Sequence, residues 1–200
     1  PSNARPPKLC VIQLGSDDAS SIYIRNKIRA CQKVGFLAEH IVFANHSSMS
    51  KLETCISHLN QDDTVDGILV QLPLPQHLDA AKVLALIDPW KDVDAITPYH
   101  LGLLMHNKPV IYPCTTAATL QILQSLALDP SGKHVVMVGA STIVGKPTAL
   151  ALLNLHATVT VCHIRTENLA NLVGQADILI TAIGKPDVIK PHWLNPKAVV

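Results

Sequence analysis

A phenol and a primary amine stand four residues apart in the segment Tyr23-Ile-Arg-Asn-Lys27. If the segment is helical, both side chains lie on one face and can act together on a bound molecule. A lysine amine in such a place can accept or donate a proton, and a tyrosine ring can pack against a flat substrate. As an isolated pair, however, this spacing is more often a solvated lysine beside a half-buried tyrosine.

Short-chain dehydrogenases also use Tyr-x-x-x-Lys, but in those enzymes the pair follows the glycine turn that binds the nucleotide. Here the pair precedes Gly139 by more than a hundred residues. That class is therefore a poor match.

Two further polar residues follow segments with a strong local pattern. Gln71 stands at the end of the apolar run Gly67-Ile-Leu-Val70, and the prolines of Leu72-Pro-Leu-Pro75 fix the direction of the chain after it. Asp94 ends the polar segment Lys91-Asp-Val-Asp94. Taken alone, Gln71 fits a turn cap as well as a ligand contact, and Asp94 fits a surface ion pair better than a ligand contact.

The apolar run His134-Val-Val-Met-Val138 leads into Gly139-x-Ser141-x-x-x-Gly145-x-Pro147, which opens a helical pattern. Strand, glycine turn and helix in this order are typical of a dinucleotide-binding crossover. Gly139 permits a sharp turn close to a pyrophosphate, Ser141 offers a hydroxyl and an amide, and Gly145 lets the helix lie close to the strand. The spacing differs from Gly-x-Gly-x-x-Gly, so on its own it is weak evidence.

The 200-residue chain is 48% hydrophobic, enough to bury a sizeable core in one large domain or two small ones. Its formal net charge is +1 and its basic clusters are short, so nucleic acid and anionic membranes are poor partners. No apolar run reaches the roughly 20 residues that span a bilayer. We expect a cytoplasmic protein, truncated at both ends because apolar strand patterns lie close to each end.

The five cysteines are scattered and odd in number, which favours reduced thiols over a disulfide framework. None of the ten histidines has the spacing of a metal ligand. The sequence therefore predicts no metal site.

Short apolar runs alternate with segments of helical periodicity, which predicts an α/β fold with parallel sheets. Strands are expected at 9–14, 37–43, 67–71, 135–138, 158–162 and 178–180, and helices at 19–34, 49–60, 77–86, 115–126 and from Gly145 onward.

Two α/β domains fit this pattern better than one, and we place them at residues 1–114 and 115–200, the second one incomplete at its C-terminus. Ligands of open α/β sheets bind beyond the carboxyl ends of the strands. The active site is therefore expected in the cleft between the domains.

Seven motifs occur together, and their order resembles that of the bifunctional methylenetetrahydrofolate dehydrogenase/cyclohydrolase family over nearly the whole chain. They are Tyr23-x-x-x-Lys27, Val70-Gln-Leu-Pro-Leu-Pro75, Lys91-Asp-Val-Asp94, Pro113-Cys-Thr115, Gly139-x-Ser-x-Ile-Val-Gly-Lys-Pro147, Thr158-Val-Thr-Val-Cys-His163 and Ala176-Asp-Ile-Leu-Ile180.

The resemblance implies an N-terminal folate-binding domain, a Rossmann-like dinucleotide-binding domain and a homodimer formed through the latter. It also implies two reactions. A hydride passes from 5,10-methylenetetrahydrofolate to NADP, and water then opens the methenyl cation to 10-formyltetrahydrofolate. No metal is needed, because the methenyl cation is already electrophilic.

The same resemblance assigns roles to individual residues. Lys27 is the general acid/base, and a cationic substrate disfavours its ammonium form. Tyr23 packs against the folate, Gln71 orients Lys27, and Asp94 holds the donor edge of the pterin ring. The implied substrate contacts are Ser20, Tyr23, Lys27, Val70, Gln71, Leu72 and Asp94, and the implied cofactor contacts are Gly139, Ala140, Ser141, Gly145, His163, Ile164 and Arg165.

The chain departs from the family pattern at two nucleotide positions. Many members have arginine at the position of Ala140 and serine at the position of Ile164, and both can bind the 2′-phosphate that separates NADP from NAD. His163 and Arg165 remain as phosphate partners. NADP stays the expected cofactor, with NAD as the alternative.

Two departures lie in the segments implied to bind folate. Ala95 replaces the usual glycine, and Thr116 and Ala118 replace proline and glycine in the usual Pro-Cys-Thr-Pro-x-Gly. If those glycines supply a positive φ or allow close backbone approach, each alanine costs about 1 kcal/mol or more and shifts the loop.

Two alternatives stay open. One is a catalytically impaired homologue that binds folate or nucleotide without turnover, as the loop substitutions suggest. The other is an NADP-dependent dehydrogenase of the shikimate type, which shares the two-domain architecture but does not explain Val70-Gln-Leu-Pro-Leu-Pro75.

Overall fold

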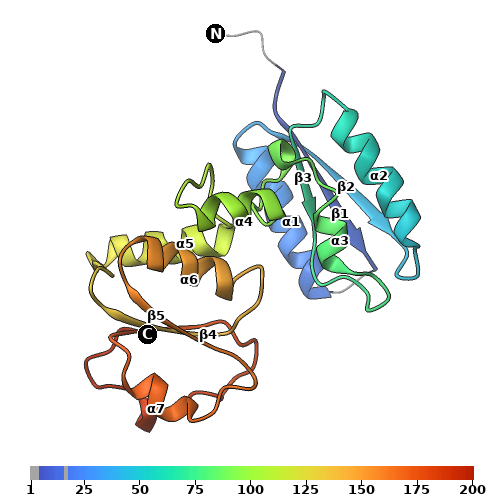
Figure 1. Ribbon diagram of the computed structural model, residues 1–200. Coiled ribbons are helices and arrows are strands. Elements are labelled where there is room, and N and C mark those ends of the chain that lie inside the picture. The colour runs from blue at the N-terminus through green and yellow to red at the C-terminus, as the bar shows by residue number, and fades with distance from the viewer. Residues whose placement is uncertain (1–4, 16–17) are drawn as a thin grey trace. The chain divides into compact units, whose positions relative to one another are not determined.

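The computed structural model describes residues 5–15 and 18–200, and the chain divides into two compact units, Pro1–Pro98 and Tyr99–Val200. Each unit contains a three-stranded parallel sheet (Figure 1). The predicted α/β class is therefore confirmed. The functional division after Cys114 stays a prediction, since compactness alone does not locate it.

The first unit is built on a central strand with a parallel neighbour on each side, in the order β2-β1-β3. Leu9 of the central strand aligns with Ala38 on one side and with Gly67 on the other. The elements are β1 (Lys8–Leu14), α1 (Asp18–Lys33), β2 (Leu37–Phe43), α2 (Met49–Gln61), β3 (Gly67–Val70), α3 (Ala80–Leu84) and the 3-10 turn η1 (Pro89–Lys91).

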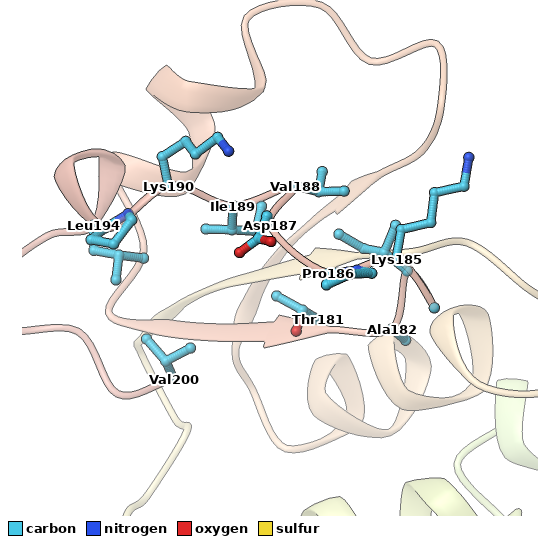
Figure 2. Close-up of a pocket in the computed structure, with 13 residues that line it drawn as sticks. Thr181, Ala182, Lys185, Pro186, Asp187, Val188, Ile189, Lys190, Leu194 and Val200 are labelled. Atoms are coloured by element: carbon cyan, nitrogen blue, oxygen red, sulfur yellow. The ribbon is translucent and has the colours of Figure 1, made fainter.

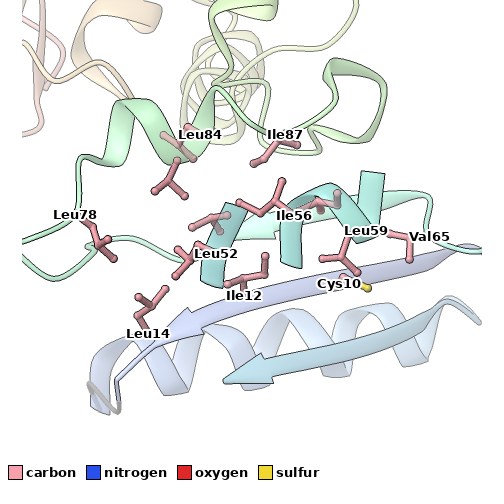
Figure 3. Packing of buried hydrophobic residues seen from close by; sticks show 13 residues of the cluster. Cys10, Ile12, Leu14, Leu52, Ile56, Leu59, Val65, Leu78, Leu84 and Ile87 are labelled. Atoms are coloured by element: carbon pink, nitrogen blue, oxygen red, sulfur yellow. The ribbon is translucent and has the colours of Figure 1, made fainter. Parts of the chain in front are cut away.

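The side chains of β1 belong alternately to two apolar layers, because successive side chains of a strand point to opposite faces of the sheet. Cys10, Ile12 and Leu14 join the main core cluster under α2 (Figure 3). Val11 packs on the other face against Ile24 of α1. Helices therefore cover both faces of this sheet.

The second unit repeats the arrangement, with the strand order β5-β4-β6. Val136 and Val138 of the central strand pack on the side of α7, whereas Val135 packs with Leu123 and Leu152 of two other helices. The elements are α4 (Pro98–Met105), α5 (Cys114–Ser125), β4 (His134–Val138), α6 (Gly145–Asn154), β5 (Thr158–Cys162), α7 (Leu169–Gly174), β6 (Ile178–Thr181) and the 3-10 turn η2 (Pro191–Trp193).

One predicted helix is shorter than its apolar pattern suggests. Helicity is expected at 77–86, but α3 covers only Ala80–Leu84. The Asp79 carboxylate accepts hydrogen bonds from the backbone N–H groups of Ala81 and Lys82, at 3.0 and 3.4 Å, and this cap fixes the start of the helix. The His77 ring instead lies 2.9 Å from the Ser47 carbonyl oxygen, so residue 77 belongs to a loop.

The glycine turn of the second unit is a point of very close backbone approach. Gly139 has φ +126°, and a Cβ at this position would lie 2.5 Å from the carbonyl oxygen of Ala182. A Cβ on Gly145 would overlap the carbonyl oxygen of Gly139. Both glycines are therefore required by the path of the chain, as the sequence predicts.

We expect Gly139→Ala to lower the free energy of unfolding by about 2–5 kcal/mol, because left-handed strain and overlap with Ala182 add together. Gly132→Ala is the matched control in the same unit. Its φ is +71°, but a Cβ there would have no neighbour within 4 Å. It should cost only about 1–2 kcal/mol. Urea denaturation measures both, and equal losses would refute the close approach as the cause.

Candidate functional site

Both sheets have a topological switch point beside the central strand. Each chain path runs from the central strand to one neighbour and only later to the other, so the connections diverge beyond the carboxyl ends of the strands. The switch points lie between β1 and β3 and between β4 and β6. Open α/β sheets bind their ligands at such points.

The turn after β4 is held together by Ser141. Its hydroxyl oxygen accepts hydrogen bonds from the N–H groups of Val144 and Gly145, at 3.2 and 3.4 Å, and so caps the start of α6. The hydroxyl proton remains available to a ligand, which fits the predicted role. Ala140, the residue between the two motif positions, is half-buried.

The loop after β5 lies at the same edge as this turn, because Val138 and Cys162 are aligned and Gly139 N donates to the Cys162 carbonyl oxygen at 2.9 Å. His163 N donates to Thr166 Oγ1 at 2.8 Å, and Arg165 N donates to His163 Nδ1 at 3.2 Å. The structure therefore brings Gly139 and the predicted contacts His163 and Arg165 to one edge. Ile164 is 97% exposed.

A cavity of about 530 Å³ adjoins the carboxyl end of β6. The amines of Lys185 and Lys190 extend to either side of it, and Asp187 lies between them with φ +58° (Figure 2). Sequence reasoning missed these residues. The available signal was the turn Gly184-Lys-Pro186, which lies a few residues after the predicted strand at 178–180.

The residues present at this edge fit a dinucleotide. Gly139 and Gly145 keep the turn free of side-chain atoms, Ser141 retains a hydroxyl donor, and cationic side chains flank the edge. An anionic pyrophosphate suits a helix N-terminus with these donors.

In the first unit, α1 presents the predicted pair. Ile24 packs on the sheet with Val11, which leaves Tyr23 65% exposed. Lys27 lies one turn further on and is half-buried, and its ammonium makes no hydrogen bond or ion pair with any described residue. The backbone of Ser20 also lies in α1, but its side chain lies outside the described residues.

Gln71 lies where β3 ends, as predicted. Its N–H donates to the Ile12 carbonyl oxygen at 2.8 Å, and its side-chain Nε2 donates to the Leu72 carbonyl oxygen at 2.8 Å. The buried Oε1 has no hydrogen-bond partner in the described part of the chain. Gln71 is therefore held by its own turn and keeps an unused acceptor, while its predicted role of orienting Lys27 stays a prediction.

The two apolar neighbours of Gln71 pack into the core under α2. Val70 is buried, and Leu72 is partly buried against the same cluster. Their side chains are occupied by packing, so any contact with a substrate would come from their backbone or from the exposed part of Leu72.

Asp94 ends a loop that is organised by a different carboxylate. Asp92 is only 3% exposed. Its oxygens accept from the N–H of Thr97 at 2.8 Å and from the N–H of Asp94 at 3.2 Å. Sequence reasoning singled out Asp94 and missed Asp92, and burial of a loop carboxylate leaves no mark in the sequence pattern.

The two alanines that replace family glycines have different surroundings. Ala95 has φ +54° and is fully buried, so a left-handed residue is indeed required there. Ala118 lies within α5, is exposed and has no positive φ, so the condition for strain is not met at this position. The neighbouring Thr116 is buried, and its Oγ1 lies 3.1 Å from Thr148 Oγ1 of α6.

The described residues show no group of three or more side chains that could hold a metal ion. None of the described helices is both long and apolar enough to cross a membrane. Burial raises the pKa of Cys10 to about 11 and also raises the pKa of Cys162 at the end of β5, so both stay thiols near neutral pH.

Known proteins resemble this chain over almost its whole length. The bifunctional protein FolD of Vesicomyosocius okutanii is 49% identical over 196 residues, which cover 98% of this chain and 71% of that protein. The solved structure of FolD from Campylobacter jejuni matches with a TM-score of 0.89 at 38% identity, over 94% of this chain and 67% of that one.

A third relative was solved with a bound nucleotide. The FolD of Trypanosoma brucei, complexed with NADP cofactor and inhibitor, matches with a TM-score of 0.90 at 34% identity, over 95% of this chain and 65% of that one. The shikimate dehydrogenase of Aquifex aeolicus reaches a TM-score of only 0.56 at 14% identity, which shows a shared fold and nothing more.

Two family profiles match successive parts of the chain. Residues 2–94 match the catalytic domain of tetrahydrofolate dehydrogenase/cyclohydrolase, and residues 113–200 match its NAD(P)-binding domain. Together with the relatives above, these matches show that the chain belongs to the tetrahydrofolate dehydrogenase/cyclohydrolase family.

Proposed function

We propose that this chain oxidises 5,10-methylenetetrahydrofolate to the 5,10-methenyl cation with NADP and then hydrolyses that cation to 10-formyltetrahydrofolate. The relatives named bifunctional FolD support the reaction pair.

We also propose a reducing compartment such as the cytoplasm for this chain. Its five cysteines are all free, which supports that location.

The observation that carries this proposal is the state of Lys27. Lys27 is half-buried as a residue, and its amine makes no hydrogen bond or ion pair with the described residues. A general acid/base needs an amine that can reach the proton it transfers, and an amine with no other partner meets that need. Lys27 is thus available for proton transfer on the same helix face as an exposed aromatic ring.

The residues of the first unit perform the hydrolytic step in this scheme. Neutral Lys27 takes a proton from the attacking water as the new C–O bond forms on the methenyl carbon. The resulting ammonium gives that proton to the ring nitrogen as the C–N bond breaks. The second proton of the water leaves the added oxygen for solvent as the formyl C=O bond forms. Tyr23 supports the folate ring system, and Asp94 accepts hydrogen bonds from the pterin. The Oε1 atom of Gln71 is an acceptor that can receive a Lys27 N–H.

The dehydrogenase step mainly requires that the folate and the nicotinamide are held in the right position for hydride transfer. NADP, when bound, accepts the hydride that leaves the bridging methylene. Gly139, Ser141 and Gly145 would hold its pyrophosphate, with Ala140 lining the turn. His163 and Arg165 would contact its 2′-phosphate, while Ile164 offers no polar atom for it.

A homodimer is also part of the proposal, formed through the second unit. An apolar groove of about 330 Å³ runs between α6 and the edge strand β5, and it is lined mainly by Leu150, Leu153, Val159 and Val161. Leu153 is 54% exposed. A second copy would cover both this groove and the edge of β5 that pairs with no other described strand.

The first test is absorbance of the methenyl product with methylenetetrahydrofolate and either NADP or NAD. We expect nucleotide-dependent formation of the methenyl species followed by accelerated decay, with NADP preferred. Lys27→Met should slow the catalysed decay of the methenyl species by about 100-fold or more, since general acid/base catalysis contributes that much.

Lys33→Met on the same helix is the matched control and should behave like the unchanged protein. Full cyclohydrolase activity in Lys27→Met would refute the role of Lys27. If the folded, unchanged protein shows no signal with either nucleotide, the impaired-homologue alternative is supported, and Ala95→Gly becomes the reversion to make.

Nucleotide preference gives a second test. Arg165→Ala should weaken NADP binding about tenfold and leave NAD binding nearly unchanged, because one charge-assisted hydrogen bond to the 2′-phosphate is lost. Lys133→Ala, beside the amino end of β4, controls for the general loss of charge. Fluorescence titration with the reduced nucleotides measures both affinities for the unchanged protein and for each variant. An equal loss for both nucleotides would contradict the assignment.

The dimer gives a third test. Light scattering should return twice the mass of one chain, and Leu153→Lys should return the mass of a single chain, because a charge would be buried in the groove. Leu126→Lys, at an exposed apolar position after α5, should leave the dimer intact. A monomeric unchanged protein would refute this part of the proposal.

A further inference from the structure

The ammonium of Lys91 closes the C-terminal end of α2. Its Nζ donates to the carbonyl oxygens of Leu59, Asn60 and Asp62, each at 2.8 Å. All three donors of the ammonium are thereby used. The last carbonyls of a helix have no partner within the helix and carry partial negative charge, so a lysine is well suited to this place.

Asn60 ties the segment before Lys91 to the same helix end. Its Nδ2 donates to the Leu86 carbonyl oxygen at 2.7 Å, and its Oδ1 accepts from the Asp88 N–H at 3.0 Å. The loop that contains Lys91 is therefore fixed to α2 at several points by side chain to backbone bonds.

Asp92, the residue after Lys91, links this fixed loop to Asp94. Asp92 pairs with Ile68 of β3 in an isolated bridge and binds the backbone N–H groups of Thr97 and Asp94. A carboxylate that accepts two backbone N–H groups holds the intervening turn in one conformation. That turn includes Ala95, whose left-handed conformation needs such support.

Close packing against β3 completes the arrangement. A Cβ on Gly67 would lie 2.5 Å from Val93 Cγ1, so the absence of a side chain on β3 lets the loop approach the sheet. The backbone of the loop is thus located by α2, by β3 and by its own carboxylate.

We infer that Lys91 and Asp92 are positioning residues that hold Asp94 in the place where it binds the pterin ring. Substrate affinity then depends on the contacts of Lys91 at the C-terminal end of α2. The inference rests on the proposed function, because it takes Asp94 as a folate contact. Neither positioning residue touches the substrate in this scheme. Preorganised contacts of this kind lower the cost of ordering a site on binding.

Equilibrium binding of 5-formyltetrahydrofolate, a stable reduced folate, to the full chain tests the inference without requiring turnover. Lys91→Met should raise the Kd of this folate about tenfold. That is the effect of losing one charged hydrogen bond between Asp94 and the pterin. Lys51→Met, at the opposite end of α2, is the matched control and should leave the Kd unchanged. The Kd for NADP should be unchanged in both variants, because the nucleotide binds the other unit.

A merely structural role would give a different result. Partial unfolding lowers the fraction of active protein, so it reduces the number of sites and the apparent kcat, whereas poor positioning raises the folate Kd and KM at an unchanged number of sites. Asp92→Asn removes one charge at the turn itself, and should weaken folate binding even if Lys91→Met proves too unstable to purify.

A double-mutant cycle with Asp94→Ala decides whether Lys91 acts through Asp94. Support requires that Lys91→Met has no further effect on the folate Kd once Asp94 is gone. The same tenfold effect in both backgrounds, or none in either, would overturn the inference while leaving the proposed function intact. If the unchanged protein fails to bind the folate, the proposed function fails first and the inference with it.

Discussion

Parallel pairing on both edges of a central strand is the constraint from which most of this structure follows. Parallel neighbours cannot be joined by tight hairpins, so each connection must cross over a face of the sheet. In each sheet the chain pairs one strand with the central strand and only later adds the strand on its other side. The two crossover connections therefore cover opposite faces of the sheet and diverge at the carboxyl end of the central strand. Two switch points result, one in each unit. Gln71 follows β3 at the first, and Gly139 follows β4 at the second.

Two lysines of the first unit show how the surroundings decide the use of one chemical group. Lys91 gives all its donors to backbone carbonyls and is thereby fixed in place. Lys27, on a helix of the same unit, has no such partners among the described residues. The first lysine stabilises a loop, and the second is left able to exchange a proton.

The sequence was most informative where one local pattern decides the structure. The strand at 37–43 has the predicted bounds, and Gly139 and Gly145 are required for the reasons read from the turn. The pattern at 77–86 was misleading because the Asp79 cap overrides apolar periodicity. The short helices α4 and α7 were missed, since few residues carry their periodicity.

The candidate site was predictable to a similar depth. Tyr23, Lys27, Gln71 and Asp94 could be named from motifs, and Ala95 lies in the strained conformation expected of a glycine position. The sequence did not reveal Asp92, because its importance comes from burial and from two backbone N–H groups that only the folded loop presents. It also suggested strain at Ala118, where a helix supplies none.

The closure of α2 by Lys91 has a consequence for how this family can vary. The partners of that ammonium are backbone carbonyls, so the contact requires a helix end at a given place but no particular side chain at residues 59 and 62. Substitutions there that keep the helix end in place leave the bond intact, and no compensating change is needed at Lys91. Correlated variation between positions would therefore miss this contact, although it joins two segments about thirty residues apart.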